Sequence, residues 1–177
     1  MTNRSELRIA GSGGQGVILA AVILAEAGLL AGLNVAQTQS IGPEARGGMC
    51  RSEVVLTDGR IGFYKVRKPT FTLALTQLSV NQYTKGLPDS GVVMMDDSLE
   101  EPTGLPAGVK LIKLPIIRTA NEVVGRAFTV NMVALGAINK VLSLVTDAQL
   151  KEAVGKNIPA GTEDVNFKAL ELGAALV

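Results

Sequence analysis

Two short segments carry the residue types that could bind an anion. Residues 11–16 read Gly-Ser-Gly-Gly-Gln-Gly, and residues 41–48 read Ile-Gly-Pro-Glu-Ala-Arg-Gly-Gly. Backbone amides of a glycine-rich turn that opens a helix can hold a phosphate or a carboxylate. The planar guanidinium of Arg46 binds the same groups through two parallel hydrogen bonds. Because the segments lie roughly thirty residues apart, about one βαβ unit, we expect them to meet at one edge of a sheet.

The second segment is expected to be an ordered loop. Pro43 fixes its own φ and biases Gly42 away from helix, while the two glycines that follow Arg46 allow conformations or close approaches that a Cβ forbids. These residues would hold Glu44 and Arg46 in place. The alternative is a solvated surface ion pair worth at most ~1 kcal/mol.

The first segment fits the Gly-x-Gly-x-x-Gly pattern of dinucleotide-binding turns, but the pattern is incomplete. That fingerprint also needs an acidic residue at the end of the second strand, and residues 36–40 contain none. A P-loop is excluded because no Gly-Lys-Ser/Thr follows the glycines. What remains is an amide-rich turn for an anion or a partner's backbone, or glycines that only let the helix pack closely on the strand.

Composition excludes several classes of function. The 177 residues carry a net charge of +1 and only 3% aromatic residues, so the chain lacks the positive field and the stacking platforms of nucleic-acid binders. There is no His, and Cys50 is the only cysteine, so this chain cannot form a disulfide, a thiolate zinc cage or an iron–sulfur cluster by itself. Without a His to activate it, Cys50 is expected to be a small packed residue in a reducing cytoplasm.

The predicted elements alternate between strands and helices. Glycine, proline and Asp-Gly punctuation delimits strands at residues 7–10, 33–39, 51–57, 60–66, 71–76, 91–95 and 110–114. Helices are predicted from residue 16, ending near Gly32, and at residues 77–85, 119–126, 131–145, 147–155 and 165–176. This order predicts a single domain over residues 1–177, with a mainly parallel, Rossmann-like three-layer α/β sheet and an inserted antiparallel hairpin formed by residues 51–57 and 60–66.

The helix that begins at residue 16 is apolar almost all round. Glu26 and the many Ala and Gly residues argue against a membrane span and for a buried helix. Such a helix needs cover on both faces, which favours a partner subunit. At the end of a later strand, Asp96 and Asp97 are expected to cap a turn in preference to binding a metal.

Four motifs in order resemble the gamma subunit of 2-oxoacid:ferredoxin (acceptor) oxidoreductases. They are residues 11–16, residues 42–48, the helix motif at residues 131–137, and Asn166, Ala169 and Gly173 near the C-terminus. The sequence before Arg46 differs from that of the indolepyruvate branch, which favours the 2-oxoglutarate or pyruvate branches. The run after Ile61 lacks the proline of many relatives, so we expect the partner contact there to differ locally.

The resemblance implies a non-catalytic subunit of a larger enzyme. The assembled enzyme would decarboxylate a 2-oxoacid, with 2-oxoglutarate favoured, on thiamine diphosphate with Mg, pass electrons through iron–sulfur clusters to ferredoxin or a similar acceptor, and form an acyl-coenzyme A. The partners would be the alpha and beta subunits, and a delta subunit where the complex has one. This chain would bind no cofactor alone and would contribute no catalytic residue and no metal ligand. Its candidate contacts to coenzyme A or to a partner are Gly11, Ser12, Gly13, Gly14, Gln15, Gly16, Ser40, Gly42, Glu44, Arg46, Gly47 and Gly48.

Two other functions stay open from the residues alone. The chain could be a stand-alone sensor of a nucleotide or an acyl-coenzyme A, or a small NAD-dependent reductase. Tight binding of NAD by the isolated chain would favour the reductase, and a ligand-induced rise in melting temperature would favour the sensor.

Overall fold

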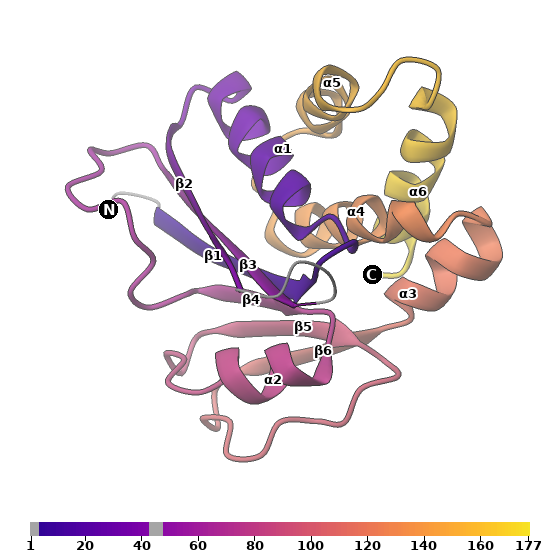
Figure 1. Cartoon of the computed structure of the whole chain (residues 1–177). Coiled ribbons are helices and arrows are strands. Elements are labelled where there is room, and N and C mark those ends of the chain that lie inside the picture. Colours follow the sequence, from indigo (N-terminus) through magenta and orange to yellow (C-terminus); the bar gives the residue numbers. More distant parts are fainter. Residues whose placement is uncertain (1–3, 43–47) are drawn as a thin grey trace.

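A six-stranded sheet forms the centre of the computed structural model, which describes residues 4–42 and 48–177. The strand order across the sheet is β2-β3-β1-β4-β5-β6 (Figure 1). The strands are β1 (Arg4–Ser12), β2 (Asn34–Ile41), β3 (Met49–Thr57), β4 (Phe71–Ala74), β5 (Val92–Asp96) and β6 (Lys110–Leu114).

Strands β1, β4, β5 and β6 run parallel to one another, and β3 runs antiparallel to both of its neighbours, β1 and β2. The predicted mainly parallel α/β sheet is therefore confirmed, and it does contain an antiparallel hairpin. The central strands are apolar on both faces, as parallel strands between two helical layers must be, and every residue of β4 is buried.

Helices cover the two faces of the sheet unequally (Figure 1). On one face lie α1 (Val17–Leu30), α4 (Val130–Leu142), α5 (Asp147–Asn157) and α6 (Glu163–Ala175), which share the main core with β1, β3 and β4. On the other face α2 (Gln77–Tyr83) packs Val80 against Ala74 and Met95. The remaining turns are the short α3 (Ile116–Arg118), the π-helix η1 (Thr119–Val124) and the 3-10 turn η2 (Ala127–Thr129).

The antiparallel hairpin is not the one that the sequence predicted. Residues 60–66 form no strand, and the hairpin consists of β2 and β3, joined through residues 42–48. The reason is that β3 pairs with β1 along one edge and β2 along the other, so no edge is left for a returning strand.

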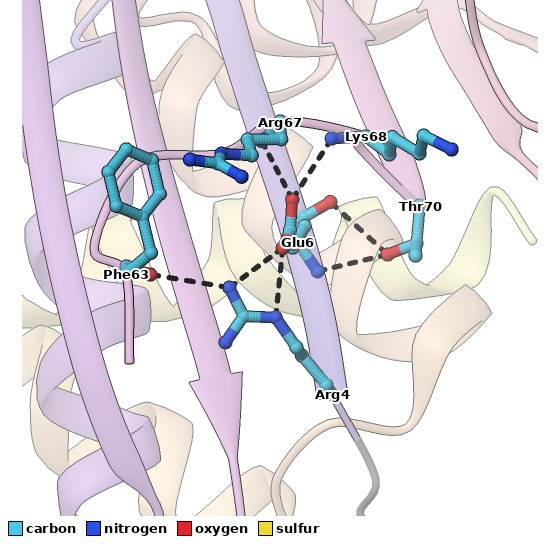
Figure 2. A network of polar contacts seen from close by, with 6 residues as sticks. All are labelled: Arg4, Glu6, Phe63, Arg67, Lys68 and Thr70. Carbon is cyan, nitrogen blue, oxygen red and sulfur yellow. Dashed lines mark hydrogen bonds and ion pairs between the residues drawn. The ribbon is translucent and has the colours of Figure 1, made fainter. Parts of the chain in front are cut away.

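The segment after β3 is held by a side chain instead of a strand ladder (Figure 2). The carboxylate of Glu6 on β1 accepts hydrogen bonds from the backbone N–H groups of Arg67 at 2.9 Å and Lys68 at 3.2 Å. Its other oxygen pairs with Arg4 at 2.7 Å, and Arg4 also donates to the Phe63 carbonyl oxygen at 3.4 Å. Burial would raise the pKa of Glu6, but these donors and the Arg4 charge outweigh it and lower the pKa below its ordinary value.

The apolar helix α1 finds its cover within the chain, so the predicted need for a partner on this helix is wrong. The sheet packs on one side of α1, and α4 and α5 pack on the other. Gln149 of α5 donates to the Leu30 carbonyl oxygen at 3.2 Å, and Lys156 pairs with Glu26 at 3.5 Å. Among the large apolar residues of α1, only Leu29 is exposed. No helix among the described residues has the length and apolar character that crossing a membrane requires.

The C-terminal helices differ from prediction mainly at their ends. The helix expected at residues 119–126 is a π-helical continuation of α3, and it stops at Gly125, whose φ is +76°. Helix α5 begins one residue after Thr146, which forms a capping box with Gln149, so Asp147 is the first helical residue. Helices α4 and α6 cross closely, because a Cβ on Gly136 or Gly173 would lie 1.9 Å from a carbonyl oxygen of the other helix.

Candidate functional site

The glycine turn links the end of β1 to the start of α1 through two residues with positive φ. Gly14 has φ +99°, and Gly16, the N-cap of α1, has φ +69°. Side chains rarely adopt this conformation, so glycine is needed at both positions. The turn is exposed at Gly13 and Gly14.

Gln15 holds the turn together from beneath. Its side-chain oxygen accepts from the Ser12 N–H at 2.8 Å, and its side-chain nitrogen donates to the Leu75 carbonyl oxygen at 3.2 Å. A Cβ on Gly11 would lie 2.5 Å from the Gln15 oxygen, so Gly11 makes room for this fold-back. Both ends of the Gln15 amide are therefore used inside the chain, and they tie the end of β1 to the end of β4.

The first turn of α1 presents backbone donors. No side chain caps this helix, and it has no acidic residue in its first turn. Within residues 4–42 and 48–177, the N–H groups of Gly14, Gly16, Val17 and Ile18 have no hydrogen-bond acceptor. Unpaired N–H groups and the positive end of the helix dipole together favour a negatively charged group at this position.

Asn131, in the first turn of α4, lies directly beside this helix start. It is 3% exposed, and a Cβ built on Gly16 would lie 2.6 Å from its Nδ2. Its Oδ1 accepts from the Met132 N–H at 3.0 Å, while its Nδ2 has no acceptor among the residues that the structure describes. The sequence pattern predicts a helix motif at Asn131 but gives it no place in the site. Its position at the start of that motif was the available signal.

The second loop reaches the same edge of the sheet, as predicted. The Gly13 N–H donates to the Gly48 carbonyl oxygen at 3.0 Å, and the Gly42 N–H donates to the Met49 carbonyl oxygen at 3.0 Å. Gly48 is buried, whereas the side chain of Ser40 is exposed and lies opposite Arg51 across the β2–β3 pair. Three of the predicted contact residues, Glu44, Arg46 and Gly47, lie outside the described residues.

Cys50 is a packed residue next to this edge. It is 5% exposed and belongs to the main core, and burial raises the pKa of its thiol above the ordinary value. The thiol therefore stays protonated at neutral pH, as expected for a small apolar residue.

Asp96 caps a turn, as predicted. Its Oδ1 accepts from the Ser98 N–H at 3.1 Å, and its Oδ2 accepts from the Ile117 N–H at 2.7 Å. Asp97 pairs with Arg118 at 3.2 Å. Within the part of the chain that the structure describes, no group of three or more Cys, Asp or Glu residues is placed to hold a metal ion.

The strand order argues against a dinucleotide site at the glycine turn. In the dinucleotide fold the second strand pairs directly with the first, and its acidic end reaches the ribose. Here β3 lies between β1 and β2, which adds roughly 4.8 Å to their separation. The end of β2 is thus displaced from the glycine turn as well as lacking an acidic residue.

Comparison with known proteins gives matches over nearly the whole chain. The family model described as pyruvate ferredoxin/flavodoxin oxidoreductase matches residues 6–176. The 2-oxoglutarate synthase subunit KorC of Methanocaldococcus jannaschii is 40% identical over 172 residues, which cover 96% of this chain and 92% of that one.

Two solved structures share the fold. The gamma subunit of a keto/oxoacid ferredoxin oxidoreductase from Geobacter sulfurreducens has a TM-score of 0.87 and 36% identity, with 98% of this chain and 96% of that chain covered. The 2-oxoglutarate:ferredoxin oxidoreductase from Magnetococcus marinus, solved with 2-oxoglutarate, coenzyme A and succinyl-CoA bound, has a TM-score of 0.86 and 26% identity. There, 98% of this chain matches 31% of a longer chain.

Proposed function

Because the chain belongs to the pyruvate ferredoxin/flavodoxin oxidoreductase family, we propose that it is the gamma subunit of an enzyme that oxidises 2-oxoglutarate to succinyl-CoA with ferredoxin or a similar acceptor. The observation that carries the proposal is the 40% identity to a 2-oxoglutarate synthase subunit over nearly the full length of both chains. As a single-domain subunit, it would work only in complex with alpha and beta subunits, and with delta where present.

The residues of this chain do not fit the cofactors of such a reaction. One cysteine cannot ligate an iron–sulfur cluster, which takes about four thiolates. The chain also contains no Gly-Asp-Gly sequence for the magnesium of thiamine diphosphate. On this proposal the clusters and thiamine diphosphate are held by the other subunits.

The glycine turn supports a share in binding coenzyme A. Its free N–H groups, the start of α1 and the spare amide of Asn131 form a donor set suited to one of the phosphates of coenzyme A. The related Magnetococcus marinus enzyme was solved with coenzyme A bound. On this proposal Gly14 and Gly16 contribute backbone donors, Gln15 fixes the turn, and Arg46 supplies a guanidinium.

The experiment is co-expression with the neighbouring reading frames, followed by affinity capture on this chain. The captured complex is assayed for reduction of a viologen dye that depends on both a 2-oxoacid and coenzyme A. We expect several subunits to be captured and 2-oxoglutarate to be the preferred substrate over pyruvate. Capture of this chain alone, or a complex without this activity, would contradict the proposal.

A further inference from the structure

The sheet face opposite α1 carries charged and polar side chains over β1, β3 and β2. Register places Arg8, Glu53 and Thr38 in one row across the three strands, and Arg51 beside Ser40 in the next. Helix α2 packs its apolar residue Val80 over β4 and β5, and only Tyr83 at its end reaches Arg8 and Arg51. The polar rows thus lie on a part of the sheet that no helix of the described chain covers with an apolar face.

One carboxylate holds two guanidinium groups in this region. Glu53 is 7% exposed, and its Oε1 lies 2.8 Å from Arg8 Nε and 3.7 Å from Arg51 Nε. The ring of Tyr83, from the end of α2, lies 5.5 Å from the Arg8 guanidinium carbon and 5.4 Å from that of Arg51. The Tyr83 ring and the shared carboxylate therefore hold both guanidinium groups in place. The single charge of the carboxylate balances only one of the two positive charges.

A hollow of about 270 Å³ lies on these residues. Lys65, on the segment that Glu6 anchors to the sheet, contributes one wall. The hollow is lined by Thr38, Gln39, Ser40, Arg51, Glu53 and Lys65.

The hollow has an excess of positive charge and of free donors. Arg51 and Lys65 line it together with one carboxylate, Glu53, and Arg8 pairs with that carboxylate from outside the lining. The four groups carry a net charge of +2. Lys65 makes no ion pair within the described residues, and its ammonium lies 5.9 Å from the Tyr64 ring. The side-chain hydroxyls of Thr38 and Ser40 have no hydrogen-bond partner in the same part of the chain.

We propose that this hollow is a binding site for a phosphate group of a small-molecule ligand. A net charge of +2 matches a phosphate dianion better than a single carboxylate, and the fork of Arg51 suits the bidentate recognition of phosphate. The volume is below the roughly 300–1,000 Å³ of pockets that enclose a whole ligand, so the site takes one anionic group while the rest of the ligand lies outside. The glycine turn does not line the hollow. The proposal therefore stands independently of the role in coenzyme A binding.

The test is calorimetric titration of the full chain with inorganic phosphate at constant ionic strength, with chloride as the balancing anion. We expect saturable binding that Arg51→Gln weakens at least 10-fold and Lys65→Gln at least 3-fold, with Arg51→Lys intermediate because it keeps the charge and loses the fork. Lys168→Gln, which removes one charge from an exposed position on α6, is the matched control and should bind as the wild type does. Lys65 is exposed, so its variant remains informative if Arg51→Gln unfolds.

Three results would overturn the proposal. One is the absence of saturable phosphate binding. The second is unchanged affinity in the Arg51→Gln, Lys65→Gln double variant, which would locate the anion elsewhere, such as at the glycine turn. The third is tighter binding of succinate than of phosphate, which would assign the hollow to a carboxylate.

Discussion

At the scale of single residues, Gly16 combines two separate constraints that a substitution can distinguish. Its φ of +69° strains any side chain, and an added Cβ would meet Asn131 at 2.6 Å. Gly32 has a similar φ of +78°, but a Cβ added there would have no neighbouring atom within 4 Å. Gly32→Ala should therefore cost about 1–2 kcal/mol of unfolding free energy from backbone strain alone.

Gly16→Ala should cost about 1–3 kcal/mol more than Gly32→Ala, because the Cβ also displaces a buried side chain. Urea unfolding of both variants measures the difference. Equal losses in the two variants would mean that Asn131 moves away freely, and would weaken its assignment as a fixed donor at the start of α1.

Glu6 gives a residue-scale prediction that depends on pH. Its pKa is lowered in the folded protein, so its contribution to stability is fully present above the ordinary glutamate pKa of about 4.3 and is lost as the pH falls below that value. Glu6→Gln should cost about 1.5–3 kcal/mol at pH 7, because the bonds it weakens are made to a charged group.

The difference in unfolding free energy between wild type and Glu6→Gln should shrink as the pH is lowered from 5 to 3. Glu171→Gln is the control, since its pair with Lys151 is exposed and should be worth no more than ~1 kcal/mol. If the difference in unfolding free energy between wild type and Glu6→Gln stayed constant over this pH range, the charge of Glu6 would not anchor the segment that carries Arg67 and Lys68.

At the scale of elements, the close contact between α4 and α6 depends on two glycines, Gly136 and Gly173. Gly173→Ala places a Cβ 1.9 Å from the Val133 carbonyl oxygen, which forces the helices apart. We expect a loss of more than about 2 kcal/mol in unfolding free energy, the range of overpacking in a core.

Gly155→Ala in the neighbouring helix α5 is the matched control for Gly173→Ala. Its Cβ would meet only the Phe167 ring at 3.9 Å, an ordinary contact. This variant should stabilise the protein by about 0.5–1 kcal/mol through helix propensity. Thermal unfolding compares the two variants directly, and similar shifts in both would refute the close helix crossing.

Local sequence signals predicted most elements of the fold. The strand at residues 110–114 matches β6 residue for residue, because a β-rich run ends at Pro115. Gly32 marks the end of α1, and the Gly91 N–H closes a turn on the Pro88 carbonyl oxygen at 2.8 Å, both as expected from glycine chemistry. Elements whose limits are set by residues close to them in the sequence were therefore predictable.

Pairings between distant parts of the chain were not predictable in the same way. Residues 60–66 have the local character of a strand, but both edges of β3 are occupied by strands from other parts of the chain. The cover of α1 comes from α4 and α5, more than a hundred residues later. In the site, the sequence spacing predicted that the two loops meet, but the contact itself comes from the antiparallel β1–β3 pair, which sets Ser12 opposite Met49. The place of Asn131 was not predicted, because only the tertiary fold brings α4 to Gly16.

At the scale of the whole molecule, these features lead to a prediction for the assembled enzyme. Asn131→Asp is nearly isosteric but replaces a donor amide with a negative charge at the start of α1. If the glycine turn faces a phosphate of coenzyme A, this variant and Arg46→Ala should each raise the KM for coenzyme A about 10-fold or more, as expected for loss of a charge-assisted contact or addition of a repulsive charge.

The same two variants should leave the KM for 2-oxoglutarate and the subunit composition unchanged if, as the proposed function implies, the other chains bind the 2-oxoacid. Asn81→Asp, at an exposed position on α2, controls for the added charge. Steady-state dye reduction by the captured complex gives both KM values. If both variants lose assembly, the turn is an interface with a partner subunit. If KM for 2-oxoglutarate rises instead, this chain contacts the oxoacid and takes a more direct part in the reaction than its residues indicate.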